Sequence, residues 1–490
     1  MGRIAKRARF PFPVAGFTNN KGHWEGLNME AISDALLLGV QTINSCLSNY
    51  VLVILLIGTG LFFSIRTRFV QVRCFGEGWR RLFGDFSLKG GAHGGGMSSF
   101  QAVATAIAAQ VGTGNIVGAC GALLVGGPGA IFWMWLIAFL GMATNYAEAV
   151  LAIETRTVDA DGGIHGGPAY YIKHAFKGKF GTFLSGFFSV AIILALGFMG
   201  CMVQSNSMAS TMSTAFNIPA WAIGAVIVIL AAFIFIGGVQ RIASVTEKIV
   251  PVMAVIYIIG GLCVIIANAA NLPAAIALIF QCAFNPNASV GGVVFGIIAA
   301  LSQGAKRGLF SNEAGMGSTP HAHAMAQVDD PHKQGVVASV AVFIDTFVVV
   351  TITALVVICT MYVGDGALAQ GLTDGIDKTN LAQLAFGSLF GEGGGNIFVA
   401  ICLLFFAFST VISWNLFARI NFEHLFGKKA LPVFTVLALV FIFLGSILSN
   451  DLVWELADMF NQLMVLPNAI ALFALSGIVV KHATKDHPRD

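Results

Sequence analysis

The residues with the clearest chemical potential lie at 108–116 (AAQVGTGNI), where two glycines and an amide interrupt an apolar stretch. Glycine tolerates non-helical backbone, and Asn115 carries both a hydrogen-bond donor and an acceptor. Non-helical backbone at membrane depth persists only where it is buried in protein or lines a wet cavity, because lipid cannot hydrogen-bond to it. This segment therefore predicts a binding site built from unwound backbone.

The composition indicates a helical membrane protein with many spans. Hydrophobic residues make up 57% of the 490 residues, and Asp, Glu, Lys and Arg make up only 10%, whereas a soluble domain carries about 25% charged residues. The net charge of +3 is distributed over loops and forms no nucleic-acid patch, so we expect no nucleic-acid partner. The eight cysteines are scattered without a CxxC pair and are expected to be buried thiols.

Apolar runs of about 20 residues, the length that crosses a bilayer about 30 Å thick, predict about eleven spans. The predicted spans are 48–65, 98–123, 128–153, 181–210, 220–237, 244–268, 288–310, 335–361, 395–418, 430–447 and 453–480. We expect a multi-pass protein of a cytoplasmic membrane, with lipid as its surroundings.

Basic residues orient these spans, because cytoplasmic loops are enriched in Lys and Arg. Every second connection is basic, through Arg66, Arg68, Arg73, Arg80, Arg81, Lys173, Lys177, Lys179, Arg241, Lys248, Lys306, Arg307, Lys333, Arg419, Lys428, Lys429, Lys481 and Arg489. The intervening loops carry a single lysine, Lys378. The pattern predicts an N-terminus outside the cell and a cytoplasmic C-terminus, although the tail 1–28 is itself basic and has no assigned role.

The first span is expected to be an addition to a repeated unit. After the tail and extracytoplasmic segment 1–47 and the extra helix 48–65, the other spans form two sets of five, over 98–268 and 288–480, and a tail 481–490 follows. Each set begins with a glycine-broken helix (98–123 and 288–310) and contains a short helix, at 169–176 and 380–386. Because five is odd, the second set enters the membrane from the opposite side. An inverted five-plus-five repeat is typical of alternating-access transporters.

Several motifs resemble the bacterial and archaeal alanine or glycine:cation symporters. They are Val111–Asn115 (VGTGN), Gly126–Gly129 (GGPG) with Phe132–Trp135 (FWMW), Ala143–Glu148 (ATNYAE) and, most specifically, Gly308–Ser318 (GLFSNEAGMGS). The similarity extends from about Met29 to the end of the chain. The resemblance implies the leucine-transporter fold and sodium-coupled uptake of a small neutral amino acid, with no cofactor and no obligate protein partner.

A zwitterionic amino acid needs partners for both of its charges, because burying either one unpaired is costly. Amides of Gly112, Thr113 and Gly114 at a half-helix N-terminus suit the carboxylate, and Asn115 is expected to brace the break or face the pocket. The amine needs oxygen acceptors. Candidates are unwound carbonyls of 288–310 and the side chains of Gln204 and Gln303, although glutamines in spans also serve to join helices.

The same resemblance aligns the carbonyls of Ala108 and Val111 with a sodium site. Its other ligands would come from the 395–418 span, through the carbonyl of Phe406 and the hydroxyls of Ser409 and Thr410. Carbonyl and hydroxyl oxygens suit a hard monovalent cation. Without the resemblance, both hydroxyls would be expected to bond back to the preceding helical turn.

Trp414 lies four residues after Thr410, so both side chains share one helix face. If Thr410 contacts the cation, Trp414 points into the pocket and occupies the volume of a larger substrate side chain, which favours glycine, alanine or at most serine. The alternative is a tryptophan of the membrane interface. Phe310 is a weaker candidate for closing the same pocket.

Charged residues within apolar spans are costly and often functional. Arg307 and Glu313 flank the Gly308–Ser318 motif near the expected cytoplasmic mouth, so we predict an ion pair between them that serves as an inner gate. Asp345 would carry a proton, support the cation shell or form an ordinary hydrogen-bonded carboxyl. His321 and His323 are expected to be a solvated pair rather than metal ligands.

The leading function is therefore a secondary transporter. A channel would need a ring of charges along its pore, and an enzyme would need a nucleophile with its base or a metal cluster. Neither pattern is present in the sequence, and no phosphate-binding loop points to ATP coupling. The alternative on the same fold is a proton-coupled transporter of another small zwitterion.

Overall fold

The computed structural model describes residues 29–84, 96–159, 163–285, 289–294, 296–448 and 450–485. The predicted tail 1–28 and the last residues, 486–490, lie outside this range. The described chain is a helical bundle with two small antiparallel ladders, which pair β1 (Thr157–Val158) with β2 (Ile164–His165) and β3 (Ser289–Val290) with β4 (Val293–Val294).

The N-terminal part forms one long helical segment and two short surface helices. Its elements are α1 (Met29–Cys46), the π-helical η1 (Leu47–Leu52), α2 (Val53–Arg66), α3 (Val70–Arg73) and α4 (Phe75–Gly84). From Leu37 to Arg66 the segment is long and apolar enough to cross a membrane. It precedes the repeated units and packs on α7 through α2.

The two halves that follow contain matching elements in the same order. The first half comprises α5 (Ser99–Gln110), η2 (Gly114–Gly118), α6 (Ala119–Gly126), α7 (Gly129–Glu154), α8 (Pro168–Ala175), α9 (Lys179–Ile192), η3 (Ile193–Gly200), α10 (Cys201–Phe216), α11 (Ala220–Ile236) and α12 (Gly238–Ala267). The connection to the second half contains η4 (Ala269–Asn271) and α13 (Leu272–Phe284). The second half comprises α14 (Ile297–Asn312), α15 (Pro320–Ala324), α16 (Pro331–Phe343), η5 (Ile344–Val350), α17 (Thr351–Val357), η6 (Ile358–Tyr362), α18 (Leu381–Phe426), η7 (Lys428–Ala430), α19 (Leu431–Ile447), α20 (Asn450–Ala474) and α21 (Ser476–Thr484).

Each half begins with an interrupted helix followed by a long one, then a short helix and a second long one, and finally two further helices. In the second half the short helix and the long one after it are joined within α18, where Gly391 has φ 73° and bends the chain. The inverted relation between the two halves stays a prediction.

The span count is smaller than predicted. Eight helices of the described chain are long and apolar enough to cross a membrane, and the bent pair α5 with η2–α6 makes up to nine. The other two predicted spans are also helices, but α11 has only 17 residues and α14 only 16.

The second glycine break also lies elsewhere than predicted. Residues 289–294 form the β3–β4 hairpin and α14 then runs without interruption from Ile297 to Asn312. The chain unwinds only after α14, where Glu313, Gly315 and Gly317 have φ values of 58°, 88° and 82°. A helix that ends inside the bundle needs fewer residues than a full span, which explains the short α14.

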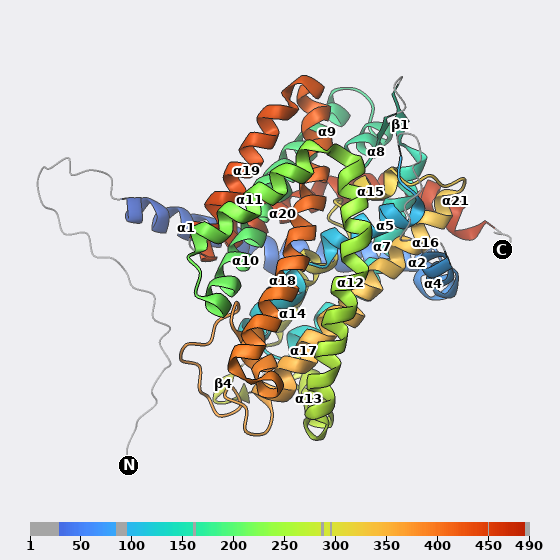
Figure 1. Cartoon of the computed structure of the whole chain (residues 1–490). Helices are drawn as coiled ribbons and strands as arrows, with labels where there is room; N and C mark the ends of the chain where they lie inside the picture. Colours follow the sequence, from blue (N-terminus) through green and yellow to red (C-terminus); the bar gives the residue numbers. More distant parts are fainter. Residues whose placement is uncertain are drawn as a thin grey trace, which may run out of the picture.

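Burial separates a central scaffold from a periphery. In α7, 89% of the most apolar 18-residue window is buried, against 28% in α19. Figure 1 shows α12 and α18 at the front of the bundle, with α7 and α14 behind them. The interrupted helices therefore lie inside protein, where unwound backbone can find partners.

Candidate substrate and cation site

The interruption expected between Val111 and Asn115 is present. Helix α5 begins at a capping box between Ser98 and Gln101 and ends at Gln110, where Val111 leaves the helical region with ψ 89°. The axis then bends by 44° into η2 and α6. All residues from Ala108 to Ile116 are buried.

Two side chains satisfy the amides that the break exposes. The Gly112 amide donates to Oδ1 of Asn115 at 2.8 Å, and the Thr113 amide donates to Oε1 of Gln204 at 3.1 Å. Asn115 therefore braces the break, as one of its two expected roles. Gln204 differs from expectation, because the oxygen proposed to accept the substrate amine is already engaged by backbone.

The break is held between α18 and α14 by close contacts. A Cβ at Gly112 would lie 2.4 Å from Thr410 Oγ1, and a Cβ at Gly114 would lie 2.9 Å from the Cα of Ser311. Any larger residue at either position would push the neighbouring helix away. Glycine is therefore required for the approach of α18 and α14 to the interruption.

The five oxygen donors expected to hold a cation lie together. Oγ1 of Thr410 is 2.8 Å from the Ala108 carbonyl, 3.0 Å from the Phe406 carbonyl and 3.4 Å from the Val111 carbonyl. Oγ of Ser409 is 2.9 Å from the same Phe406 carbonyl. The Thr410 hydroxyl has one proton for three acceptors, so the cluster has unused acceptor capacity that suits a small cation.

Three buried polar atoms at or beside the break have no hydrogen-bond partner in the described part of the chain. They are Nε2 of Gln204, Oγ1 of Thr113 and the acceptor Oε1 of Gln110, and all three side chains are almost fully buried. Buried polar groups are normally paired, so these atoms indicate a polar ligand. With its oxygen engaged, Gln204 offers a donor, which suits a carboxylate rather than an amine.

Gln303 does not lie at the break, contrary to the prediction. It is only partly buried, its Cβ lies against Gly126, and it lines an open cavity with Gln41, Ser302 and Lys306. The reason is that α14 runs from Ile297 to Asn312, so residue 303 lies inside a continuous helix and its neighbours offer no unwound carbonyls.

Aromatic side chains form a wall next to the break. Phe310 packs edge-on against Trp414 at a ring distance of 5.6 Å and against Trp454 at 5.0 Å. Trp414 is 1% exposed and donates its indole N–H to the carboxylate of Glu313. This burial excludes an interfacial tryptophan. Nothing in the sequence singled out Trp454, because it lies in none of the motifs that carry the family resemblance.

Three buried carboxylates surround the two breaks and accept hydrogen bonds from neutral donors. Asp345 accepts from Asn115 at 2.5 Å and from Ser311 at 2.9 Å, so it joins the first break to the end of α14. Glu148 accepts from the amides of Gly315 at 3.1 Å and Gly317 at 2.9 Å, so it clamps the second break. The third is Glu313, which accepts from Trp414.

Arg307 and Glu313 do not pair with each other, so the predicted inner gate is wrong in its partners. Arg307 donates two hydrogen bonds to Asp458 of α20, at 3.2 and 3.0 Å, while Glu313 bonds Trp414 and Ser318. Arg307 precedes the second break and lies over the same Trp454 ring as Lys378 of the loop 363–380. Lys306 and Arg307, which were predicted to belong to the cytoplasmic loops, therefore lie instead with a loop predicted to be on the other side.

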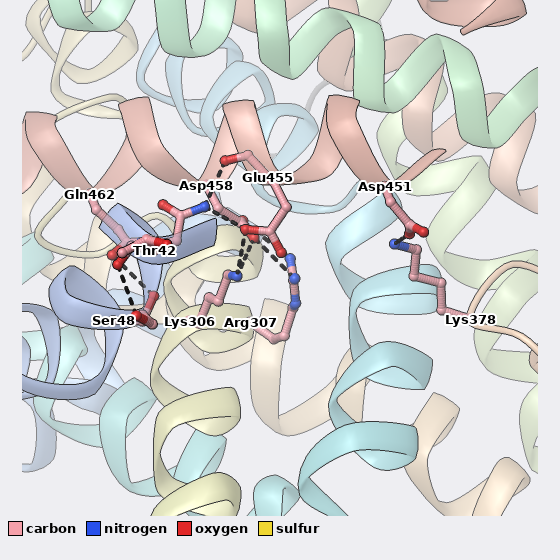
Figure 2. Close-up of polar contacts among 11 residues, drawn as sticks. Thr42, Ser48, Lys306, Arg307, Lys378, Asp451, Glu455, Asp458 and Gln462 are labelled. Carbon is pink, nitrogen blue, oxygen red and sulfur yellow. Dashed lines mark hydrogen bonds and ion pairs between the residues drawn. The ribbon is translucent and has the colours of Figure 1, made fainter. Parts of the chain in front are cut away.

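Figure 2 shows the polar network around this ion pair. Lys306 also contacts Asp458, at 2.7 Å, and Lys378 pairs with Asp451 at 3.2 Å. The Arg307 guanidinium lies 4.8 Å from the centre of the Trp454 ring. Burial lowers the pKa of Lys378, and nearby Arg307 lowers it further.

The expected solvated pair His321 and His323 is buried instead, at 1% and 0% exposure on α15. His321 hydrogen-bonds the Ser318 carbonyl and Asn421, and its ring stacks against Phe188. Both histidines follow the second break directly, where the chain re-enters the bundle. Their position in a predicted loop gave no indication of this burial.

The profile of the sodium:alanine symporter family matches residues 33–489. The chain belongs to this family. It is 40% identical over 442 residues to the sodium/alanine symporter AgcS of Methanococcus maripaludis, covering 90% of this chain and 95% of that protein. It is 38% identical over 447 residues to the probable sodium/glutamine symporter GlnT of Bacillus subtilis, covering 91% and 89%.

Among solved structures, a mutant of the Eremococcus coleocola manganese transporter aligns with a TM-score of 0.50 over 78% of each chain, at 14% identity. This likeness concerns the fold alone, which is the leucine-transporter fold. The family consists of sodium-coupled amino-acid symporters, so the chain is a multi-pass membrane transporter of prokaryotic type and not an enzyme.

Replacing Gly112 with alanine tests the close packing at the break. Because the new Cβ would lie 2.4 Å from Thr410 Oγ1, we expect at least a tenfold loss, about 1.4 kcal/mol, of sodium-dependent amino-acid binding. Titration of purified protein with labelled alanine as the probe measures it. Gly118→Ala is the matched control, since its Cβ would meet nothing closer than 3.7 Å. Equal binding by the two variants would contradict the packing.

Proposed function

We propose that the protein takes up a small neutral amino acid, alanine or glycine, together with sodium by alternating access between the two repeats. The observation that carries this proposal is the oxygen cluster around Thr410, with three carbonyls within 3.4 Å of one hydroxyl. It lies directly beside a break whose neighbours include two unpartnered polar atoms, in Thr113 and Gln204. The cation and the substrate would therefore both bind to the interrupted segment 108–115.

The sodium ligands would be the carbonyls of Ala108, Val111 and Phe406 with the hydroxyls of Ser409 and Thr410. Because these oxygens come from α5 and α18, a bound cation would hold the two helices together. A ligand shifts a conformational equilibrium only by the difference in its affinity for the two conformations. Sodium would therefore favour the conformation in which α5 and α18 are in contact over one in which they are apart.

The substrate carboxylate would bind at the break to Nε2 of Gln204 and the hydroxyl of Thr113, since the amides of Gly112 and Thr113 already donate to Asn115 and Gln204. The positive end of the half-helix η2–α6 favours an anion there. The carboxylates of Glu313 and Asp345 are the acceptors nearest to this region that could balance the ammonium, in place of the glutamines expected from the sequence.

The aromatic wall supports a small side chain on the substrate. Trp414, Phe310 and Trp454 are buried and in mutual contact through Phe310, so they leave little volume beyond the break. This argues for glycine or alanine over glutamine, the substrate in the name of one relative.

The orientation with a cytoplasmic C-terminus follows from the basic loops and is supported by their contacts. Arg156 bonds the Ala324 carbonyl, Lys428 pairs with Asp159, and His482 lies 3.4 Å from Glu154. These contacts gather loops that were predicted to be cytoplasmic on one face of the bundle. The Arg307–Asp458 pair would then close the outer side of the site.

A proton-coupled carrier of another small zwitterion is the second candidate. It is favoured by Asp345, a fully buried carboxylate whose side-chain partners in the described chain are the neutral residues Asn115, Ser311 and Thr346. Such a group could carry a proton in place of a metal cation.

Uptake of labelled alanine into proteoliposomes tests the function and separates the two candidates. An inward sodium gradient without a proton gradient should drive uptake that saturates in both solutes. Uptake that follows a proton gradient in sodium-free buffer would support the second candidate and overturn the first.

Thr410→Ala removes the central oxygen of the proposed cation site. We expect the sodium concentration for half-maximal uptake to rise at least about tenfold, because the remaining carbonyls lose the hydroxyl that joins them. Thr410→Ser keeps the hydroxyl and should stay close to the wild type. An unchanged sodium dependence in Thr410→Ala would remove this residue from the cation site.

Trp414→Ala should widen the range of accepted side chains, because it removes the largest part of the aromatic wall. The ratio of glutamine to alanine uptake, measured by competition, is expected to increase at least about tenfold, roughly 1.4 kcal/mol of discrimination. Trp414→Phe keeps an aromatic ring but loses the pyrrole part of the indole with its N–H bond to Glu313, so it should retain more of the preference for small substrates than Trp414→Ala. The same ratio in all three proteins would contradict the assignment.

Asp458→Asn tests the proposed outer closure. It removes the carboxylate that lies 3.0 Å from the buried Arg307 and 2.7 Å from Lys306, whereas Lys306 keeps Glu455 at 3.8 Å. Loss of the partner of a buried charge is strongly unfavourable. We expect uptake to fall and a cysteine introduced at Phe310, in a Cys46→Ser/Cys263→Ser background, to react faster with a membrane-impermeant thiol reagent added outside.

Asp451→Asn is the matched control for this experiment. It breaks the pair with Lys378, but the Asp451 side chain is 77% exposed, and exposed pairs contribute little. Equal labelling rates in the two variants would argue against closure by the Arg307–Asp458 pair.

A further inference from the structure

Three side chains of different ligand type meet on the basic face, remote in sequence from the site around Thr410. Cys74 directly precedes α4, Glu77 lies in the first turn of α4, and His332 lies in the first turn of α16. One ligand atom from each lies within 4.8 Å of the other two. Cys74 is 8% exposed and His332 is 1% exposed, while Glu77 is partly buried.

His332 and Glu77 each have a second polar atom, and that atom is bonded to another residue. The Tyr146 hydroxyl contacts Nδ1 of His332 at 2.7 Å, and Arg81 donates to Oε1 of Glu77 at 2.8 Å. These contacts leave Nε2 of His332 and Oε2 of Glu77 facing each other at 3.5 Å. Outer partners that orient imidazole and carboxylate in this way are typical of metal sites.

The distance between these two atoms fits a common metal ion. Two ligands bound at about 2.0–2.1 Å in a tetrahedral arrangement lie roughly 3.3 Å apart. The Cys74 sulfur lies within 4.8 Å of both atoms and would have to move closer to them to complete the set.

The backbone that carries the ligands is already in place. Gly78 lets α4 lie directly on α16, because a Cβ there would be 2.5 Å from the Val336 carbonyl. Phe75 of α4 also packs edge-on against Phe343 of α16 at 4.9 Å. The ligands from the two helices are therefore brought together by packing that needs no metal.

We propose that Cys74, Glu77 and His332 bind one divalent transition-metal ion, with zinc as the best match and water in the fourth position. Thiolate with imidazole and carboxylate is a donor set for zinc or cobalt, whereas sodium, calcium and magnesium prefer oxygen alone. The ion joins the surface helix α4 to α16, and through Tyr146 it is braced against α7.

Metal binding to the purified full-length protein tests this proposal. After treatment with a chelator, cobalt(II) should bind once per chain and produce a thiolate-to-cobalt charge-transfer band, and zinc should displace it. Zinc should also raise the Tm to a saturating value, because an ion that binds only the folded state stabilises it.

The variants identify the ligands. Cys74→Ser should abolish the charge-transfer band, and His332→Gln or Glu77→Gln should lower zinc affinity at least tenfold. Tyr146→Phe keeps all three ligands and should lower affinity about 10- to 100-fold. Monodisperse elution and helical circular dichroism show that each variant is folded.

The Cys46→Ser/Cys263→Ser variant removes the two exposed thiols and should bind cobalt like the wild type. A band that persists in Cys74→Ser, or that disappears in the Cys46→Ser/Cys263→Ser variant, would overturn the proposal. So would binding of less than one zinc per chain by the wild-type protein.

Discussion

Backbone that is interrupted inside a membrane must find its hydrogen-bond partners within the protein. An unpaired buried amide or carbonyl costs roughly 1–3 kcal/mol, and lipid offers no partner. The chain meets this constraint twice with polar side chains. Asn115 and Gln204 accept the amides of the first break, and Glu148 accepts those of the second. The site exists because these side chains keep the unwound segments open.

The two breaks are joined, so a change at one reaches the other. Asp345 bonds Asn115 of the first break and Ser311 just before the second, and Gln110 donates to the Asn312 carbonyl at 2.8 Å. Gly114 packs against Ser311 at the same place. A cation beside Thr410 and a substrate at the break would therefore act on one connected set of bonds. Such a shared element is the physical basis of coupling between two ligands.

The sequence predicted what local pattern and family resemblance can encode. The glycine break, the three carbonyls around the Thr410 hydroxyl and the inward position of Trp414 all depend on motifs or helical spacing. The partner of Arg307 could not be predicted, because Asp458 lies 151 residues away and belongs to no motif. Gln204 and Gln303 were equally good candidates for the substrate site, because both are polar residues in apolar spans. Because α14 stays helical as far as Asn312, Gln303 lies more than two helical turns before the second break, and this could not be read from the sequence.

Charge is unevenly distributed along the bundle. Lys306, Arg307 and Asp458 form the network toward the loop 363–380, while Glu313 lies beyond them, close enough to interact electrostatically with Asp345 and Glu148. Buried carboxylates with only neutral donors are unfavourable when more than one is ionised, because their repulsion is weakly screened. A positive charge entering next to them relieves that repulsion. Under the proposed function, this arrangement favours a cation and an ammonium group that arrive together.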